Sequence, residues 1–268
     1  MNDSDATDAA NASADQRGST GPANVPADSS TAPTYAPNSG LEWLHVALVV
    51  GMFVASALCW SSAPDQIPMH WNVKGEVDRY GGKLEGLLLL PAITAGLYLL
   101  LRFIPAVDPG KANYVQFSKV YSLIRVATTL VMVAVHGVTL AWALGYRMNM
   151  GAVVSISVGG LFLLLGNVMG KIRPNWFVGI RTPWTLSSKL SWTRTHRVGG
   201  WLFMGIGVAI LACGFFQSEW AIGATLVGTL GGTLFLVIYS FYVWRQDESR
   251  IPPAGTLPAT ESEDREAI

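Results

Sequence analysis

The stretch LEGLLLLPAITAGLYLLLRFI, residues 84 to 104, contains only two charged residues, Glu85 and Arg102. About 20 predominantly apolar residues suffice for a helix to cross the hydrocarbon core of a bilayer. Pro91 is compatible with such a helix, because neighbouring helices can satisfy the backbone carbonyl that a proline leaves free. The stretch therefore predicts a transmembrane helix, and it sets the fold class of the chain.

Five more apolar runs of similar length occur, at residues 41–60, 120–144, 150–168, 198–216 and 221–244. The whole chain is 50% hydrophobic and 13% charged, whereas soluble domains carry about 25% charged residues. We therefore predict an all-α fold, a polytopic membrane helical bundle with about six transmembrane helices. We expect an N-terminal three-span domain at 41–145 with a connecting loop at 61–83. A C-terminal three-span domain at 146–244 follows, with a basic loop at 169–197.

The two ends of the chain are polar. Residues 1–40 are acidic and rich in Pro, Ala and Ser, and residues 245–268 are also polar. Segments of this composition bury too little apolar surface to offset the entropy of ordering. We expect two disordered tails, and we expect the first apolar run to be an uncleaved signal anchor.

The Lys and Arg residues near the spans are distributed unequally. Eleven lie on the side of the basic loop and four on the side of the 61–83 loop. Positively charged loops stay in the cytoplasm. The sequence thus predicts a multi-pass protein of the plasma membrane with both termini cytoplasmic, and with residues 61–83 as the main extracytoplasmic segment.

The basic loop reads KIRPNWFVGIRTPWTLSSKLSWTRTHR, residues 171 to 197, with six Lys or Arg and no acidic residue. One interpretation is that the cations fix topology and attract anionic lipid, while Trp176, Trp184 and Trp192 anchor at the interface. Topology is indifferent to residue order, however, and Pro and Gly at close spacing fix turns. Pro174, Gly179 and Pro183 therefore favour a shaped loop.

Residues 166 to 200 closely resemble the characteristic block of SdpI-like membrane proteins, the immunity family for a secreted sporulation-delaying toxin. The positions that carry this resemblance are Asn167, Asn175, Gly179, Ile180, Arg181, Thr182, Pro183, Trp184, Thr185, Leu186, Trp192, His196 and Arg197. A second stretch, IPMHWNVKGEVDRYGGK at residues 67 to 83, resembles a small domain of unknown function that often forms the N-terminal half of such proteins. Its matching positions are Pro68, His70, Trp71, Asn72, Gly75, Asp78, Tyr80, Gly81 and Lys83.

The resemblance covers roughly residues 41 to 244 and implies a membrane protein that protects against, or senses, a secreted membrane-active peptide. It implies no enzyme and no cofactor. The partners that it suggests are the lipid bilayer, a toxin peptide outside and a cytoplasmic regulator inside, without direct binding of nucleic acid. The two blocks supply the candidate site residues: Asn167, Asn175, Gly179, Arg181, Thr182, Pro183, Trp184, Trp192, His196 and Arg197 on the cytoplasmic side, and Pro68, His70, Trp71, Asn72, Gly75 and Asp78 outside.

The outer segment combines His70 with Glu76 and Asp78, a set that could bind a divalent cation or transfer a proton. A metal site requires three or more ligands, so we favour a polar turn without metal. In that turn Gly75 and Gly81 would adopt positive φ, and Asp78 would accept backbone hydrogen bonds.

Three of the ionisable residues inside the predicted spans lie away from the span ends or bear on function: Arg125, His136 and His45. Arg125 lies close enough to the cytoplasmic end of its helix to snorkel toward the interface. His136 lies deeper, where we expect a neutral imidazole that is hydrogen-bonded to another helix, and we interpret His45 in the same way. A single histidine gives little support to the alternative of a small transporter, because transporters usually carry polar groups near the midplane.

A further alternative is a lipid-headgroup enzyme at the inner leaflet, with His196 as base and Arg181 or Arg197 holding a phosphate. No carboxylate accompanies these residues, which makes this alternative the weakest. For Arg181 we hypothesise instead that its planar guanidinium holds the turn around Asn175 and Thr182, or grips an anionic group, so that lysine cannot replace it.

Overall fold

The computed structural model describes residues 35–72, 74–216 and 219–250, and within these ranges it contains six helices that are long and apolar enough to span a membrane. The predicted helical bundle is thereby confirmed. The long helices are α1 (Ser39–Cys59), α2 (Lys83–Val107), α3 (Tyr114–Ala143), α4 (Met150–Met169), α6 (Lys189–Phe216) and α7 (Glu219–Arg245). A 3₁₀ turn, η2 (Lys111–Asn113), precedes α3, and the short helix α5 (Pro183–Leu186) precedes α6. Most of both predicted tails lies outside the described residues.

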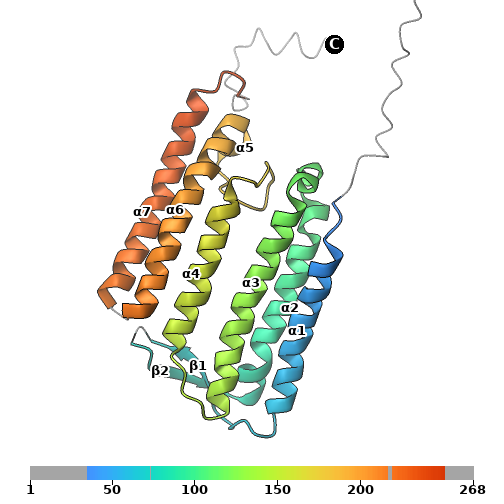
Figure 1. Ribbon diagram of the computed structural model, residues 1–268, viewed down its shortest axis with the longest axis vertical. Helices are drawn as coiled ribbons and strands as arrows, with labels where there is room; N and C mark the ends of the chain where they lie inside the picture. Colours follow the sequence, from blue (N-terminus) through green and yellow to red (C-terminus); the bar gives the residue numbers. More distant parts are fainter. Residues whose placement is uncertain (1–34, 73, 217–218, 251–268) are drawn as a thin grey trace, which may run out of the picture. The chain divides into compact units, whose positions relative to one another are not determined.

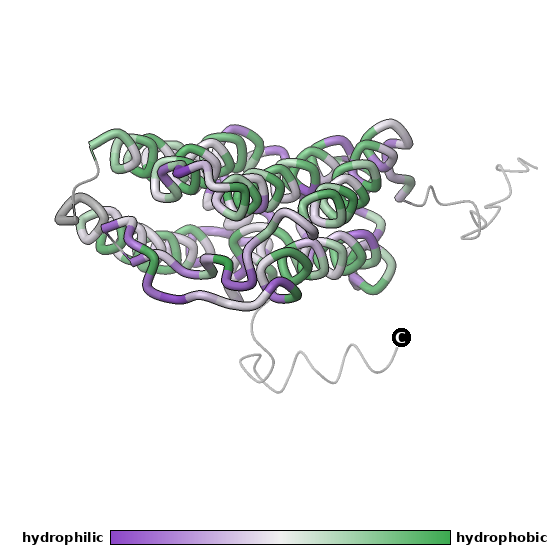
Figure 2. Tube along the Cα trace, turned by 90° about the horizontal axis from the view of Figure 1, so that it is seen from below, coloured by the Kyte–Doolittle hydropathy of each residue, from purple (hydrophilic) through white to green (hydrophobic). Residues whose placement is uncertain are grey.

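The long helices run alternately up and down, so the connections gather at two ends (Figure 1). The hairpin end contains residues 60–82 and 144–149. The loop end contains residues 108–113 and 170–188, together with the first and last described residues of the chain. Helices α1, α2 and α3 pack on one another, α4 packs on α6 and α6 on α7, and α3 also contacts α4. In Figure 2 the helices are mostly hydrophobic, and the hydrophilic residues concentrate in the connecting segments.

One segment of the described chain forms β-strands. Residues Ile67–Trp71 and Val77–Gly81 form an antiparallel two-stranded sheet, β1 and β2, with Ile67 paired to Gly81 and Trp71 to Val77. The prediction for this segment was a polar turn, which accounts only for its tip. Asn72 forms that tip by accepting hydrogen bonds from the backbone N–H groups of Lys74 (2.9 Å) and Glu76 (3.0 Å).

Glycines let α4 and α6 approach closely. A Cβ at Gly159 would lie 3.0 Å from the carbonyl oxygen of Gly207, and one at Gly166 would lie 2.6 Å from that of Gly200. Helix backbones in membranes approach in this way where small residues face each other. Small residues of α4 therefore pack directly against α6. In α7, by contrast, a Cβ at Gly228 would meet open space.

The predicted helix boundaries agree with the structure within three residues, except at the start of α3, which begins six residues earlier than predicted, and at the start of α6. The predicted fifth span began at residue 198, whereas α6 begins at Lys189. The first turns of α6 carry buried polar residues, so hydropathy alone did not reveal them. Trp192, His196 and Arg197, which were assigned to the basic loop, consequently lie on α6.

Candidate functional site

The loop between α4 and α6, residues 170–188, is folded around the buried side chain of Asn175. Its Oδ1 accepts hydrogen bonds from the N–H groups of Phe177 (2.9 Å) and Val178 (2.6 Å). Its Nδ2 donates to the carbonyl oxygens of Arg173 (2.8 Å) and Val178 (3.0 Å). An amide side chain can replace backbone partners in this way, and residues 170–182 of the loop thus have a defined path without secondary structure.

Asp108, at the end of α2, ties this loop to the N-terminal helices. It is 1% exposed, and its carboxylate accepts hydrogen bonds from the N–H of Trp176 (3.1 Å) and the hydroxyl of Tyr114 (2.8 Å). Nearby, Nδ2 of Asn113 donates to the carbonyl of Pro174 (2.7 Å). The sequence analysis did not select Asp108 as a site residue, although the Asp-Pro-Gly sequence at 108–110 is a turn signal.

Gly179 and His196 form the second fixed point of the loop. Gly179 has a φ of +107°, and a Cβ at this position would overlap Nε2 of His196. That Nε2 accepts a hydrogen bond from the N–H of Ile180 (3.0 Å), while Nδ1 donates to the carbonyl of Trp192 (2.8 Å). One ring nitrogen accepts and the other donates, which defines a neutral imidazole. Neither nitrogen remains free to act as the base of a lipid-headgroup enzyme.

Thr182 and Pro183 begin α5. The hydroxyl of Thr182 accepts from the N–H of Thr185 (3.1 Å), and Oγ1 of Thr185 accepts from the N–H of Thr182 (2.9 Å), which is a reciprocal cap. Proline at the first helical position has no N–H to lose there. The Thr182 hydroxyl also lies 3.0 Å from that of Ser240, so α5 is attached to α7.

The three tryptophans of the basic segment occupy different environments. Trp192 is only 2% exposed; its indole N–H donates to the carbonyl of Ile172 (2.9 Å), and its ring stacks on His196. The prediction that Trp192 anchors at the interface is therefore wrong. Trp176 is exposed, and Trp184 is half-buried against Phe241.

Arg181 is exposed, and its Nη1 donates to the carbonyl of Trp176 (2.8 Å), which closes the turn between these two residues. This hydrogen bond lies within the turn between Asn175 and Thr182 to which the hypothesis assigned the guanidinium. Whether lysine can replace Arg181 stays a prediction. Asn167 and Arg197 are exposed on α4 and α6, and they are not among the residues whose hydrogen bonds order the described loop.

At the opposite end, the hairpin carries the second group of predicted site residues. His70 Nδ1 lies 2.6 Å from Asp78 Oδ1, and both side chains are exposed. The expected backbone contacts of Asp78 are thus replaced by this pair. Gly75 has a φ of +79°, as predicted, whereas Gly81 has no positive φ. Among the described residues, no three His, Cys, Asp or Glu side chains lie together as a metal site would require.

The hairpin also forms one wall of a pocket of about 450 Å³ at this end. Trp71, Asn72 and Gly75 come from the hairpin segment, and the other walls come from α4, α6 and α7. Apolar side chains dominate these walls, including Met150, Val154, Phe162, Ile210 and Leu226. Pockets of this size, with an apolar lining and a few polar groups, are typical ligand sites. Pro68 is buried in β1 and does not line the pocket.

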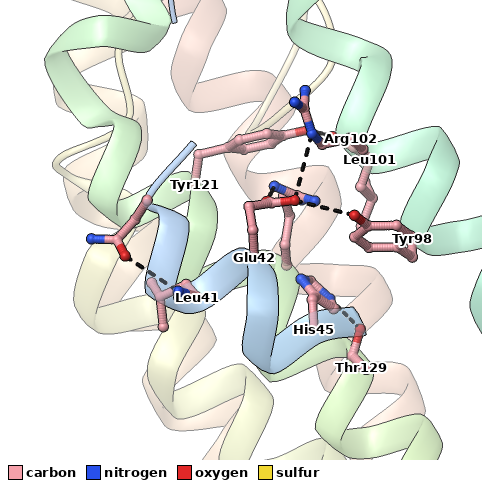
Figure 3. A network of polar contacts seen from close by, with 10 residues as sticks. Leu41, Glu42, His45, Tyr98, Leu101, Arg102, Tyr121 and Thr129 are labelled. Carbon is pink, nitrogen blue, oxygen red and sulfur yellow. Dashed lines mark hydrogen bonds and ion pairs between the residues drawn. The ribbon is translucent and has the colours of Figure 1, made fainter. Parts of the chain in front are cut away.

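Between α1, α2 and α3 lies a charged cluster that the sequence analysis missed (Figure 3). The side chain of Arg125 is 1% exposed and forms an ion pair with Glu42, in the first turn of α1. Glu42 also accepts a hydrogen bond from the hydroxyl of Tyr98 (3.2 Å) and lies 3.5 Å from Nε of Arg102. The predicted snorkelling of Arg125 is wrong, because its guanidinium reaches a carboxylate inside the bundle.

The two intramembrane histidines form the contacts that the sequence predicted. Nε2 of His136 lies 3.0 Å from the hydroxyl of Ser56 on α1, and Nε2 of His45 lies 2.5 Å from that of Thr129 on α3. Both side chains are buried and connect neighbouring helices. These contacts give the Nε2 atom of each histidine a polar partner, and a polar atom without a partner inside a membrane is costly in free energy.

The structure thus defines a class of membrane protein: a bundle of six spans with a folded basic loop at one end and a β-hairpin at the other. Residues 171–242 match the SdpI/YfhL protein family, and residues 47–95 match a domain of unknown function, DUF1648. These two matches confirm the resemblance to the SdpI-like family. A curated protein, Immunity protein SdpI of Bacillus subtilis (strain 168), is 21% identical over 203 residues, which cover 76% of this chain and 95% of that protein. No solved structure gives a significant match.

Proposed function

We propose that this membrane protein protects a cell against a secreted membrane-active peptide, or senses such a peptide, and that it contacts the peptide at the hairpin end. The observation that carries the proposal is the apolar pocket bounded by Trp71, Asn72 and Gly75. A membrane-active peptide presents apolar side chains, and their burial contributes about 25 cal/mol per Å². The similarity to Immunity protein SdpI supports the same function.

The orientation of the chain is part of this proposal. Eleven of the Lys and Arg residues near the spans lie at the loop end and four at the hairpin end, so the positive-inside rule places the loop end in the cytoplasm. The pocket then opens toward the side from which a secreted peptide arrives.

Reporter fusions test the orientation. A reporter that is active only outside the cytoplasm should work when fused after Gly75, at the tip of the hairpin, and should be silent when fused after Arg250. A cytoplasmic reporter should give the reverse pattern. Activity of the extracytoplasmic reporter after Arg250, with none after Gly75, would invert the proposed topology.

The function itself is tested by survival. Cells that lack their own immunity protein and express this chain should survive the sporulation-delaying toxin at concentrations that kill cells carrying the empty vector. We expect Leu226→Asn to reduce protection about tenfold or more, because burial of a leucine contributes about 1.5–3 kcal/mol.

Leu230→Asn is the matched control for this experiment. Leu226 and Leu230 lie one turn apart on α7 and are 61% and 71% exposed, but only Leu226 lines the pocket. Membrane levels of both variants are compared by immunoblot. Equal loss of protection in the two variants would refute the pocket as the peptide site, and killing of cells with the unaltered chain would refute protection against this toxin.

A further inference from the structure

A second pocket, of about 640 Å³, lies at the loop end, away from the hairpin. Its walls come from four segments that are distant in the sequence. They are η2 and the start of α3 with Asn113 and Gln116, the loop with Arg173, the first turns of α6 with Lys189 and Thr193, and Ser249 after α7. Its volume falls within the range of about 300–1,000 Å³ that is usual for small-ligand sites. The proposed peptide site does not use this pocket.

Among the residues that the structure describes, the charged ones that line this pocket are Arg173 and Lys189, and both are cations. Both are exposed, and among the described residues neither side chain forms an ion pair. A cation without a partner elsewhere on the protein retains all its donors for a ligand. Arginine offers a planar fork that matches the oxygens of a phosphate, and lysine adds a compact point charge.

The acidic residue Asp247 lies close to the pocket. Asp247 does not line it, but its carboxylate accepts hydrogen bonds from the hydroxyls of Ser188 and Ser249, two of the lining residues. Those hydrogen bonds, first that from Ser188, hold the pKa of Asp247 below its ordinary value. Asp247 is therefore ionised at neutral pH, and the three residues Arg173, Lys189 and Asp247 together carry one net positive charge.

Most neutral polar groups of the pocket are already engaged. The hydroxyl of Ser187 donates to the carbonyl of Pro183 (2.7 Å), and that of Thr193 donates to the carbonyl of Lys189 (2.9 Å). The amide of Gln116 makes one long contact, of 3.5 Å, to Asn113. The donors that remain thus belong chiefly to Arg173, Lys189 and Gln116, which is the pattern of an acceptor-binding site.

We propose that this pocket binds a phosphate group, either in the headgroup of a phospholipid or as free phosphate. The pocket lies beside the first turns of α3 and α6, at the level where helices that span a bilayer meet lipid headgroups. A phosphate accepts charge-assisted hydrogen bonds from arginine, lysine and an amide together. Arg181 and Arg197 do not line the pocket and take no part.

Thermal unfolding of the purified chain in a non-ionic detergent tests this site, because a ligand that binds only the folded state raises the Tm. Inorganic phosphate is titrated against chloride at matched ionic strength. In a separate arm, phosphatidylglycerol is titrated against diacylglycerol with the same acyl chains. We expect the phosphate-bearing member of at least one pair to raise the Tm more than its partner does.

The variant Arg173→Gln/Lys189→Gln should require at least tenfold more ligand for half of the shift. Lys171→Gln/Arg194→Gln is the control, since it removes two exposed cations that do not line the pocket. A response to inorganic phosphate identifies free phosphate as a source, and a response to phosphatidylglycerol alone identifies the headgroup. Equal shifts within both pairs, or equal weakening in the two double variants, would overturn the proposal.

Discussion

Glu42→Gln is expected to lower the free energy of unfolding by about 3–5 kcal/mol, because it leaves the Arg125 guanidinium buried without a counter-charge. That guanidinium lies among the rings of Tyr98 and Tyr121, with centroids at 5.6 and 5.9 Å. Rings can attract a cation, but they do not replace a carboxylate. The measurement is thermal or denaturant-induced unfolding in detergent micelles.

Two further variants make this prediction specific. Glu42→Leu/Arg125→Leu should recover most of the lost stability, since apolar residues often replace a buried ion pair without loss. Glu85→Gln removes a comparable ion pair with Arg79, but Arg79 is 57% exposed there, so we expect a loss of only about 0–1 kcal/mol. If Glu85→Gln lowers the free energy of unfolding as much as Glu42→Gln does, then burial does not determine how much the Glu42–Arg125 ion pair contributes to stability.

Gly179→Ala is the second change for which we expect a large effect, a loss of more than about 3 kcal/mol. Two costs combine at this position. A φ of +107° is unfavourable for any residue with a Cβ, and the new Cβ would overlap the His196 ring. The ring cannot easily turn aside, because it stacks on Trp192 at 4.0 Å between ring centroids and both its nitrogens are hydrogen-bonded.

Gly75→Ala separates the two costs. Gly75 also has a positive φ, of +79°, but a Cβ there would meet open space. This control should therefore show only the backbone cost, about 1–2 kcal/mol. The yield of folded protein and the Tm of both variants are measured in the same detergent. Similar losses in the two variants would show that the contact between Gly179 and His196 does not restrain the loop.

The spans could be predicted because hydropathy is a local property of the sequence. Each apolar run, such as residues 84–104, is long enough to span a bilayer without reference to the rest of the chain. The hairpin was missed because β1 and β2 have five residues each, too few for a period-two pattern to stand out among polar neighbours.

The residues that form buried contacts could be predicted only in part. Asn175, Gly179 and His196 were selected through the family resemblance, and the structure brings all three into the loop end of the bundle. The partners Glu42 and Asp108 were not selected, because each contacts residues far away in the sequence: Arg125 is 83 positions from Glu42, and Trp176 is 68 from Asp108. Composition and spacing carry no information about such pairs.

The attachment of the loop to Asp108 also dictates an order of events during biosynthesis. A membrane chain emerges from the ribosome N-terminus first, so α1, α2 and α3 are made before Asn175 and Trp176 exist. Until then the Asp108 carboxylate lacks its Trp176 N–H partner and retains water in its place. Docking of residues 170–188 removes that water, and the first three helices therefore reach their final hydrogen bonding only after the second half of the chain has been translated.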